Sequence, residues 1–372
     1  MENVIYWLWL TLKKRINSVK IKRLLEYFGT IEDIYLSKSF DKFNGLSETD
    51  KSALMDKNTD NAKNVIEKIK KLNAKIITFD DVNYPKPLRN IANPPYVLYV
   101  QGNLPDMENV LAIGVVGTRR CSEYGRTVTK HICKRLAENG VITVSGLAAG
   151  IDAVAAWSTL DAGGITVAVV GNGLDILYPA ENADLIQEIA KKGCIISEYP
   201  PGMPALPYNF PHRNRIIAGL SRGVVVTEAP KKSGALITAR FALENNRDVF
   251  AVPGNITDPK TQGTNQIIQE GAKLVNSAED IICEYPYAVK IVRSEKTDMP
   301  ECNKKRDISE KYNNLNDGEK DIINILMKRD AQIDEIAREL NIPVNELNTR
   351  LIMLEMKGII KKLPGSSYQI KI

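Results

Sequence analysis

Glycine-rich stretches in the middle of the chain carry the amide, hydroxyl and cationic groups that bind anions. The first begins Gly117-Thr118-Arg119, where a glycine turn offers backbone amides and the arginine can hold a phosphate through two parallel hydrogen bonds. The second begins Ser145-Gly146 and runs to Gly150 at the start of a predicted helix, where two glycines let the backbone approach a ligand. Tight strand–helix packing also uses small residues, and it is the alternative for this second loop.

The richest stretch, Asn209–Ser221, combines an aromatic ring with two arginines around an asparagine. Arg213, Asn214 and Arg215 supply groups for phosphates, and Phe210 supplies a ring for an unstacked base. Core packing is the alternative for Phe210, and a surface charge without a ligand is the alternative for an isolated arginine.

Two further loops add candidates of the same kind. Lys232-Ser233-Gly234 enters another helix, but the GxxxxGK[ST] spacing of a nucleotide phosphate loop is absent. Gly202, which ends the Ser197–Gly202 stretch, could present an unhindered amide. The loop at Gly117 likewise lacks the GxGxxG fingerprint of dinucleotide-binding folds. The pattern therefore favours single phosphates and predicts no nucleotide cofactor.

Composition narrows the function classes. The chain has 372 residues and a net charge of +5, which permits a polyanionic partner without identifying one. Only two histidines, His131 and His212, and no CxxC pair leave little material for a metal site or a histidine-dependent triad. The apolar run Val4–Leu12 is too short to span a bilayer, which takes about 20 residues. We therefore expect a cytoplasmic protein with no membrane partner, no metal and no catalytic residues.

Short apolar runs that alternate with amphipathic stretches must position these loops. The alternation predicts a doubly wound, mostly parallel sheet of the α/β class, in which ligands bind at the carboxyl ends of the strands. The predicted strands are Val110–Val116, Val141–Val144, Ile165–Val170, Cys194–Ile196, Gly223–Thr227 and Asp248–Val252. Helices are predicted near 125–139, 150–162, 182–192, 234–246 and 263–271. Because the glycine-rich loops follow these strands, we expect one anion-binding cleft along a single edge of the sheet.

Changes in apolar periodicity and in polarity divide the chain into four segments. Residues 1–78 predict a small helical module, and residues 79–286 form the α/β core. Residues 287–312 are polar and read as a linker. Residues 313–372 predict three helices followed by two short strands, which is a winged-helix outline. A helix-hairpin-helix at Asn17-Ser18-Val19 is an alternative for the first module, although the usual hairpin glycines are missing.

Taken together and in this order, the short sequence motifs of the core resemble those of the DprA/Smf family of DNA-processing proteins. The motifs that carry the resemblance are Gly117-Thr118-Arg119, Ser122–Gly125, Ser145–Ala148, Gly150–Asp152, Gly173–Asp175, Tyr178-Pro179, Ser197–Gly202, Phe210-Pro211, Arg213–Ser221, Ser233–Ala239 and Val252–Gly254. The flanking modules also match a common layout of that family, with a SAM-like or helix-hairpin-helix-like module in front and a winged helix behind.

The resemblance implies an extended Rossmann-like core that binds and protects single-stranded DNA. It also implies a homodimer that loads the RecA recombinase during natural transformation. Arg119, Gly202, Lys232 and Ser233 would contact backbone phosphates, and Phe210 would stack on a base. Family members are not known as enzymes.

Two other functions stay open on the residues alone. The lonely-guy phosphoribohydrolases use a related Rossmann-like sheet, but their PGGxGTxxE loop is not reproduced at Pro253-Gly254-Asn255 or Lys232-Ser233-Gly234. The second alternative is a transcriptional regulator that reads duplex DNA with the winged helix. Its predicted recognition helix, Pro343–Lys357, contains two cations, Arg350 and Lys357, and two glutamates. Such a helix lacks the excess positive charge that favours binding to a duplex.

Overall fold

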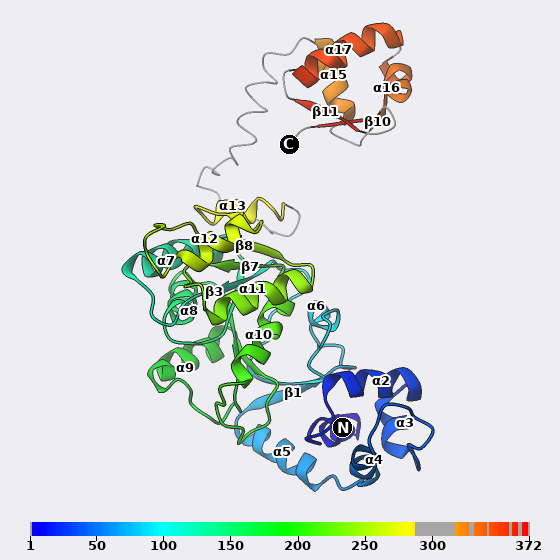
Figure 1. The fold of residues 1–372 in the computed structure, drawn as a ribbon, viewed down its shortest axis with the longest axis vertical. Helices are drawn as coiled ribbons and strands as arrows, with labels where there is room; N and C mark the ends of the chain where they lie inside the picture. Colours follow the sequence, from blue (N-terminus) through cyan, green and yellow to red (C-terminus); the bar gives the residue numbers. More distant parts are fainter. Residues whose placement is uncertain are drawn as a thin grey trace. The chain divides into compact units, whose positions relative to one another are not determined.

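The computed structural model describes residues 2–286, 317–326, 331–340, 342–356, 359–363 and 367–370. The described residues up to 286 form one compact unit and those from 317 onward form a second (Figure 1). The linker predicted at 287–312 lies outside the described residues. The predicted boundary between residues 78 and 79 stays a prediction.

A nine-stranded sheet forms the centre of the first unit, in the order β1-β2-β6-β5-β4-β3-β7-β8-β9. Strands β3 to β9 pair with one another in parallel. At one edge β1 pairs antiparallel with β2, and β2 pairs antiparallel with β6. The strands are β1 Ala74–Thr78, β2 Val97–Gly102, β3 Ala112–Val116, β4 Ile142–Ser145, β5 Thr166–Val170, β6 Cys194–Ser197, β7 Gly223–Val226, β8 Asp248–Ala251 and β9 Lys273–Leu274. The predicted α/β fold and its six strands are confirmed, while β1, β2 and the two-residue β9 were not predicted.

Helices cover both faces of the sheet, as a doubly wound fold requires (Figure 1). They are α6 Lys86–Arg89, α7 Glu123–Glu138, α8 Ile151–Asp161, the 3-10 turn η1 Ala180–Asn182, α9 Ala183–Lys192, α10 Asn209–Leu220, α11 Gly234–Glu244, α12 Gln262–Gln269 and α13 Glu279–Ile282. In β3, Ile113 and Val115 point into the core under α7 and α8. Ala112 and Val116 point to the opposite core, under α10 and α11. Both faces of the strand are buried, which explains its continuous apolar sequence.

The chain reverses its direction of winding at β3. After β3 it builds β4, β5 and β6 on one side, and it then returns to place β7 on the other side. The loops that follow β3 and β7 therefore lie next to each other at the carboxyl edge, and the Thr118 amide donates to the Glu228 carbonyl at 2.8 Å. Such a switch point is where open α/β sheets bind their ligands.

Five helices precede the sheet: α1 Glu2–Thr11, α2 Ser18–Phe28, α3 Ile31–Leu36, α4 Glu48–Met55 and α5 Asp60–Lys71. They confirm the predicted small helical module. Its core continues into the sheet, because Trp7 stacks on Tyr96 with ring centroids 5.5 Å apart and Tyr99 of β2 is buried in the same cluster. No helix in the described part of the chain is long and apolar enough to cross a membrane.

The second unit contains α15 Asp317–Leu326, β10 Ala331–Gln332, α16 Ile333–Leu340, α17 Val344–Met356, β11 Ile360–Leu363 and β12 Ser367–Ile370. Its three strands pair in the order β10-β12-β11. Ile322, Leu347 and Leu351 of its core are fully buried. The predicted winged-helix outline is confirmed, with β10 as an additional short strand.

Candidate nucleic-acid interface

A cavity of about 180 Å³ opens at the carboxyl edge of the sheet, between the loops after β3, β4 and β5 and the first turns of α10. We call it the edge cavity. Four of the predicted site residues line it, namely Arg119, Gly146, Phe210 and Arg213. Residues Asn209–Leu220 form a helix, α10, that was not among the predicted helices. Phe210 and Arg213 share this cavity because residues three apart lie on one face of a helix.

Phe210 and Arg119 form a joint surface at the mouth of the edge cavity. The Phe210 ring lies 5.3 Å from the Tyr178 ring, measured between centroids. The guanidinium carbon of Arg119 lies 5.3 Å from the centroid of the same Phe210 ring. Phe210 is half-buried and Arg119 is exposed. A cation lying over an aromatic ring at the surface supplies one group for a phosphate and one for its neighbouring base.

Arg213 forms the buried wall of the edge cavity and is only 4 % exposed. Its Nη1 donates to the Val169 carbonyl, and its Nε has no hydrogen-bond partner. Burial lowers the pKa of this guanidinium to about 10. Burial also raises the pKa of the Asp152 carboxyl to about 6, against the opposing effect of Arg213. At neutral pH both groups are ionised, so Asp152 balances the charge of Arg213 inside the protein.

Asp152 also organises the loop after β4. Its carboxylate accepts the Gly146 amide at 3.0 Å, and its own carbonyl accepts the Ser145 hydroxyl at 3.4 Å. A Cβ at position 146 would lie 2.3 Å from Nη1 of Arg213, so a glycine is needed for the guanidinium to pass. Ser145 and Gly146 are both buried. The Gly146 amide and the Ser145 hydroxyl are thus both bonded to Asp152 inside the protein, and of the two residues only Gly146 lines the edge cavity.

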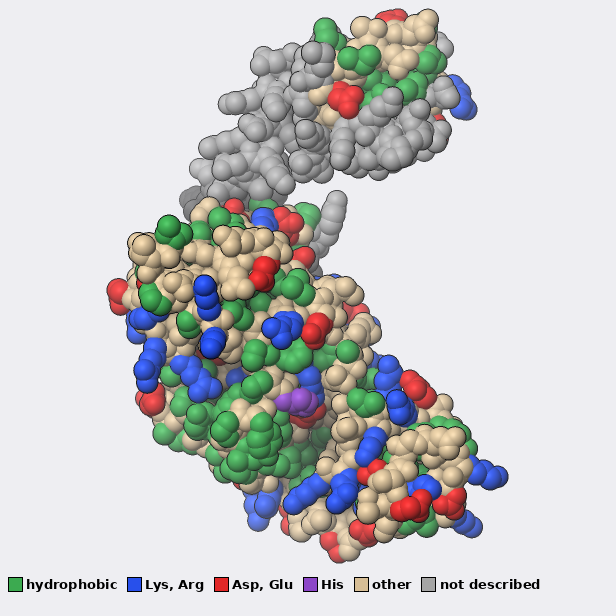
Figure 2. All heavy atoms as spheres, in the orientation of Figure 1, with side chains coloured by type: hydrophobic (Ala, Val, Ile, Leu, Met, Phe, Trp, Pro, Cys, Tyr) green, Lys and Arg blue, Asp and Glu red, His purple; other side chains and the backbone are tan. Residues whose placement is uncertain are grey.

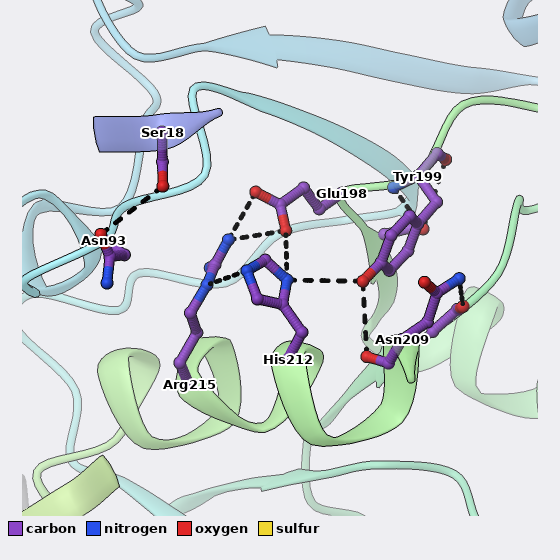
Figure 3. A network of polar contacts seen from close by, with 9 residues as sticks. Ser18, Asn93, Glu198, Tyr199, Asn209, His212 and Arg215 are labelled. Carbon is purple, nitrogen blue, oxygen red and sulfur yellow. Dashed lines mark hydrogen bonds and ion pairs between the residues drawn. The ribbon is translucent and has the colours of Figure 1, made fainter. Parts of the chain in front are cut away.

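Arg215 points away from Arg213, because residues two apart on a helix do not share a face. Its Nη2 donates to both carboxylate oxygens of Glu198, at 2.6 and 2.7 Å, and its Nε donates to Nε2 of His212 at 3.4 Å. The Tyr199 hydroxyl lies 3.5 Å from Nδ1 of His212 and donates to the Asn209 carbonyl at 3.4 Å (Figure 3). This network fixes the first turn of α10 to the loop after β6. The expectation that Arg215 presents a free charge is wrong, because Arg215 is 3 % exposed and paired.

A carboxylate of the chain itself occupies the amino end of α7. Glu228 is fully buried in the loop after β7, and it accepts the Ser122 amide at 2.8 Å and the Ser122 hydroxyl. Ser122 caps α7 by accepting the Gly125 amide at 3.0 Å. In many Rossmann-like folds this helix start receives the phosphates of a ligand. Here Glu228 fills it, and sequence reasoning missed this residue although it follows a buried strand at the switch point.

The loop between β7 and α11 lies beside the loop that carries Arg119. Ser233 caps α11 by accepting the Ala235 amide at 3.2 Å, and Nδ2 of Asn214 donates to the Gly234 carbonyl at 3.2 Å. Lys232 is exposed, and a Cβ at Gly234 would meet no atom within 4 Å. The loop thus presents an exposed lysine and open backbone at the edge of the sheet.

Three predicted residues have local structural roles. A Cβ at Gly117 would lie 2.5 Å from Ile151, so this glycine permits close packing. The Thr118 hydroxyl accepts the Arg120 amide at 3.3 Å. Gly202 is exposed with a φ of +90°, but its amide donates to Oδ1 of Asp175 at 2.7 Å. The expectation of an unhindered amide at Gly202 is therefore wrong.

Comparisons with known proteins agree with this architecture. A family profile described as "DNA recombination-mediator protein A" matches residues 75–286, and one described as "DprA winged helix domain" matches residues 310–366. The chain is 34 % identical to "Protein Smf" of Synechocystis sp. over 98 % of each chain. It is 40 % identical to "DNA processing protein DprA" of Streptococcus pneumoniae, over 71 % of this chain and 82 % of that protein.

Two solved structures are similar as well. The X-ray structure of DNA processing protein A from Streptococcus pneumoniae superposes with a TM-score of 0.65 at 37 % identity, covering 75 % of this chain and 97 % of that one. A structure of DNA processing protein A from Helicobacter pylori, which describes a single-stranded DNA binding mode, gives a TM-score of 0.53 at 30 % identity, covering 58 % of this chain and 97 % of that one. The chain therefore belongs to the DprA/Smf family of DNA-processing proteins.

Proposed function

We propose that this protein binds single-stranded DNA independently of sequence, protects it, and loads the RecA recombinase on it during transformation and recombination. The observation that carries the proposal is the joint surface of Arg119 and Phe210 at the edge cavity. Its support is the similarity to DNA processing protein A of Helicobacter pylori, for which a single-stranded DNA binding mode is described. Homodimer formation and a cytoplasmic location, both expected from the sequence, are part of the same proposal.

The chemistry of this surface supports affinity without sequence readout. A phosphate carries no base information, and every base has a face that can stack on an aromatic ring. We assign phosphate contacts to Arg119, Lys232 and Ser233 and base stacking to Phe210. Gly202 joins them only where its amide leaves Asp175.

The buried residues position these groups. Arg213, whose charge is balanced by Asp152, forms the buried wall of the edge cavity beside Phe210. Arg215 and Asn214 fix α10 to the loop after β6 and to the loop before α11. They act on DNA through the placement of Phe210 and Lys232.

A salt titration of the full chain tests the proposal. Fluorescence anisotropy with a labelled oligothymidine and with a labelled duplex of equal length gives the preference, and unlabelled nucleoside monophosphates serve as competitors. We expect strong preference for the single strand, a steep loss of affinity with salt, and no competition by nucleotides. Equal affinity for both DNAs, or displacement by a nucleotide, would contradict the proposal.

Loading of RecA has its own test. RecA is added to oligothymidine that already carries a single-strand-binding protein, with and without this chain, and DNA-dependent ATP hydrolysis by RecA is followed. We expect this chain to shorten the delay before hydrolysis, and we expect Phe210→Ala to restore the delay. A delay that does not respond to this chain would remove RecA loading from the proposal and leave DNA binding intact.

The enzyme alternative is disfavoured by Glu228. A nucleotide phosphate at the start of α7 would have to displace a buried carboxylate that already accepts the Ser122 amide. Two negative groups in one site repel each other strongly where water is excluded. Release of free base from AMP by the purified protein would favour the enzyme alternative.

The duplex-reading alternative is disfavoured by the second unit. On α17, Arg350 is already paired with Glu346, four residues earlier on the same helix. Lys357 lies outside the described residues. Removal of residues 313–372 distinguishes the roles, because a duplex reader loses duplex binding whereas a single-strand binder of the proposed kind keeps its affinity for oligothymidine.

A further inference from the structure

A second cavity, of about 430 Å³, lies between α7 and α8. We call it the α7–α8 cavity and define it by Arg120, Arg126, Lys130 and Trp157, which line it. We propose that it is a second nucleotide subsite, in which Trp157 stacks on a base and the three cations hold the adjoining phosphates. This proposal rests on the proposed function and extends the path of single-stranded DNA along the protein.

The positions on the two helices bring these groups together. Arg126 and Lys130 are four residues apart on α7, and Trp157 and Asp161 are four residues apart on α8, so each pair shares one helix face. The helices pack against each other through a common core that includes Ile132 of α7. The basic face and the aromatic face therefore border the same cavity.

The charge of the α7–α8 cavity favours an anion. Arg119, Arg120, Arg126 and Lys130 line it against one acidic residue, Asp161. Within the described part of the chain, neither Arg120 nor Lys130 has an ion-pair partner, and Arg126 has only the exposed Glu123 at 3.7 Å. Lys and Arg side chains gather on this flank of the unit, where Figure 1 draws α7 and α8 (Figure 2).

Trp157 supplies the second component of a single-strand site. Its exposed fraction is 38 %, whereas Trp7 and Trp9 are 2 % and 3 % exposed. An exposed indole beside several cations is the combination found in grooves that bind single strands, where each base stacks on an aromatic ring and each phosphate meets a cation.

The two cavities share one lining residue. Arg119 lines both the edge cavity and the α7–α8 cavity. A phosphate held by Arg119 would therefore have one neighbouring base at Phe210 and the next part of the strand directed toward Trp157. A polymer can use both cavities, whereas a free mononucleotide can use only one.

Tryptophan fluorescence of the full chain tests this proposal. Of the three tryptophans, Trp157 alone is exposed, so stacking on it should quench the exposed part of the emission. Oligothymidines of about 4 to 16 nucleotides are titrated, and anisotropy of a labelled strand records binding independently. We expect quenching that grows with oligonucleotide length and is absent in Trp157→Phe.

Charge reversal gives the second readout. The variant Arg126→Glu with Lys130→Glu should weaken the longer oligothymidines roughly fivefold or more while the shortest ones bind as before. Lys134→Glu is the matched control, because Lys134 is an exposed lysine one turn further along α7 and does not line the cavity. Thermal unfolding of each variant verifies that it is folded.

Each outcome has a defined meaning. Binding by anisotropy without Trp157 quenching, together with charge-reversal and control variants that behave alike, overturns this proposal and leaves the proposed function standing. No binding of any oligothymidine overturns both. A change of Trp157 emission with protein concentration in the absence of DNA would show that a second copy covers the cavity, and it would also overturn the proposal.

Discussion

Replacement of Arg119 by alanine should change both the affinity for single-stranded DNA and its dependence on salt. Each phosphate neutralised on a single strand contributes about 0.7 to the slope of log affinity against log salt. Removing one contact should therefore reduce the slope by about 0.7. A hydrogen-bonded contact to a charged group is worth about 1.5–3 kcal/mol.

In the protein without DNA, Arg119 already makes a favourable contact that reduces the net gain from binding a phosphate. The Arg119 guanidinium lies over the Phe210 ring, and such an exposed cation–π contact is worth about 0.5–1 kcal/mol. This cation–π contact is lost when a base stacks on Phe210 in place of the guanidinium. The net loss for Arg119→Ala is then about 1–2 kcal/mol, or roughly 5- to 30-fold in affinity.

Two other variants separate charge from stacking and from folding. Phe210→Leu should lower affinity by about 1–3 kcal/mol without changing the salt slope, because no phosphate contact is lost. Arg213→Ala should leave the slope unchanged but destabilise the fold by about 3–5 kcal/mol, since Asp152 would be buried without its counter-charge.

Anisotropy titrations with labelled oligothymidine at several salt concentrations measure the slopes, and urea unfolding measures the stabilities. A wild-type slope for Arg119→Ala would refute the phosphate contact. A slope that falls equally in Arg119→Ala and Arg213→Ala would refute the distinction between an exposed contact and a buried wall.

Three further predictions address the elements that hold the site. Glu228→Ala leaves the half-buried amide and hydroxyl of Ser122 without their acceptor, so we expect a loss of about 2–5 kcal/mol in the free energy of urea unfolding. Glu228→Gln should recover most of this loss, because its side-chain amide can still form hydrogen bonds at this position. Burial raises the pKa of Asp152 to about 6, so the protonated carboxyl stabilises the fold below the unfolded-state pKa, and this stabilisation is lost as the pH rises through 6. Between pH 4 and pH 7 the wild type should therefore lose about 2 kcal/mol of stability relative to Asp152→Asn, and a pH-independent difference would contradict this. Ala149 lines the edge cavity without a charge, so Ala149→Lys should raise oligothymidine affinity and steepen the salt slope by about 0.7, and an unchanged slope would place this position off the path of the DNA.

The sequence was a good guide to the parallel part of the fold. The runs from Val110 to Val252 are apolar on both faces, which is the pattern of strands covered by helices on two sides. Strand β1 was missed because Ala74–Thr78 is a short edge strand directly after a lysine-rich helix. The helix at Asn209–Leu220 was hidden by Pro211 near its start, a position that an α-helix tolerates in its first turn.

The site was harder to predict than the fold. Sequence patterns identified Arg119 and Phe210 as neighbours in function, and the structure places them at one cavity. They did not show that Arg213 and Arg215 are buried, because the compensating groups Asp152 and Glu198 are distant in sequence. One signal was available, since arginines two apart on a helix cannot both face one cleft.

The aromatic contact between Trp7 and Tyr96 determines which truncated variants of this protein keep their apolar surface covered. A fragment that starts after residue 78 would keep β2 and lose the helices that cover Tyr96 and Tyr99. The uncovered side chains of Tyr96 and Tyr99, an exposed aromatic strip, would favour self-association. Such a deletion would therefore change the assembly of the protein as well as remove any contact of the helical module with DNA. Single substitutions at the exposed lysines of α5, such as Lys63 and Lys70, leave that strip covered and isolate the contribution of the module's charge.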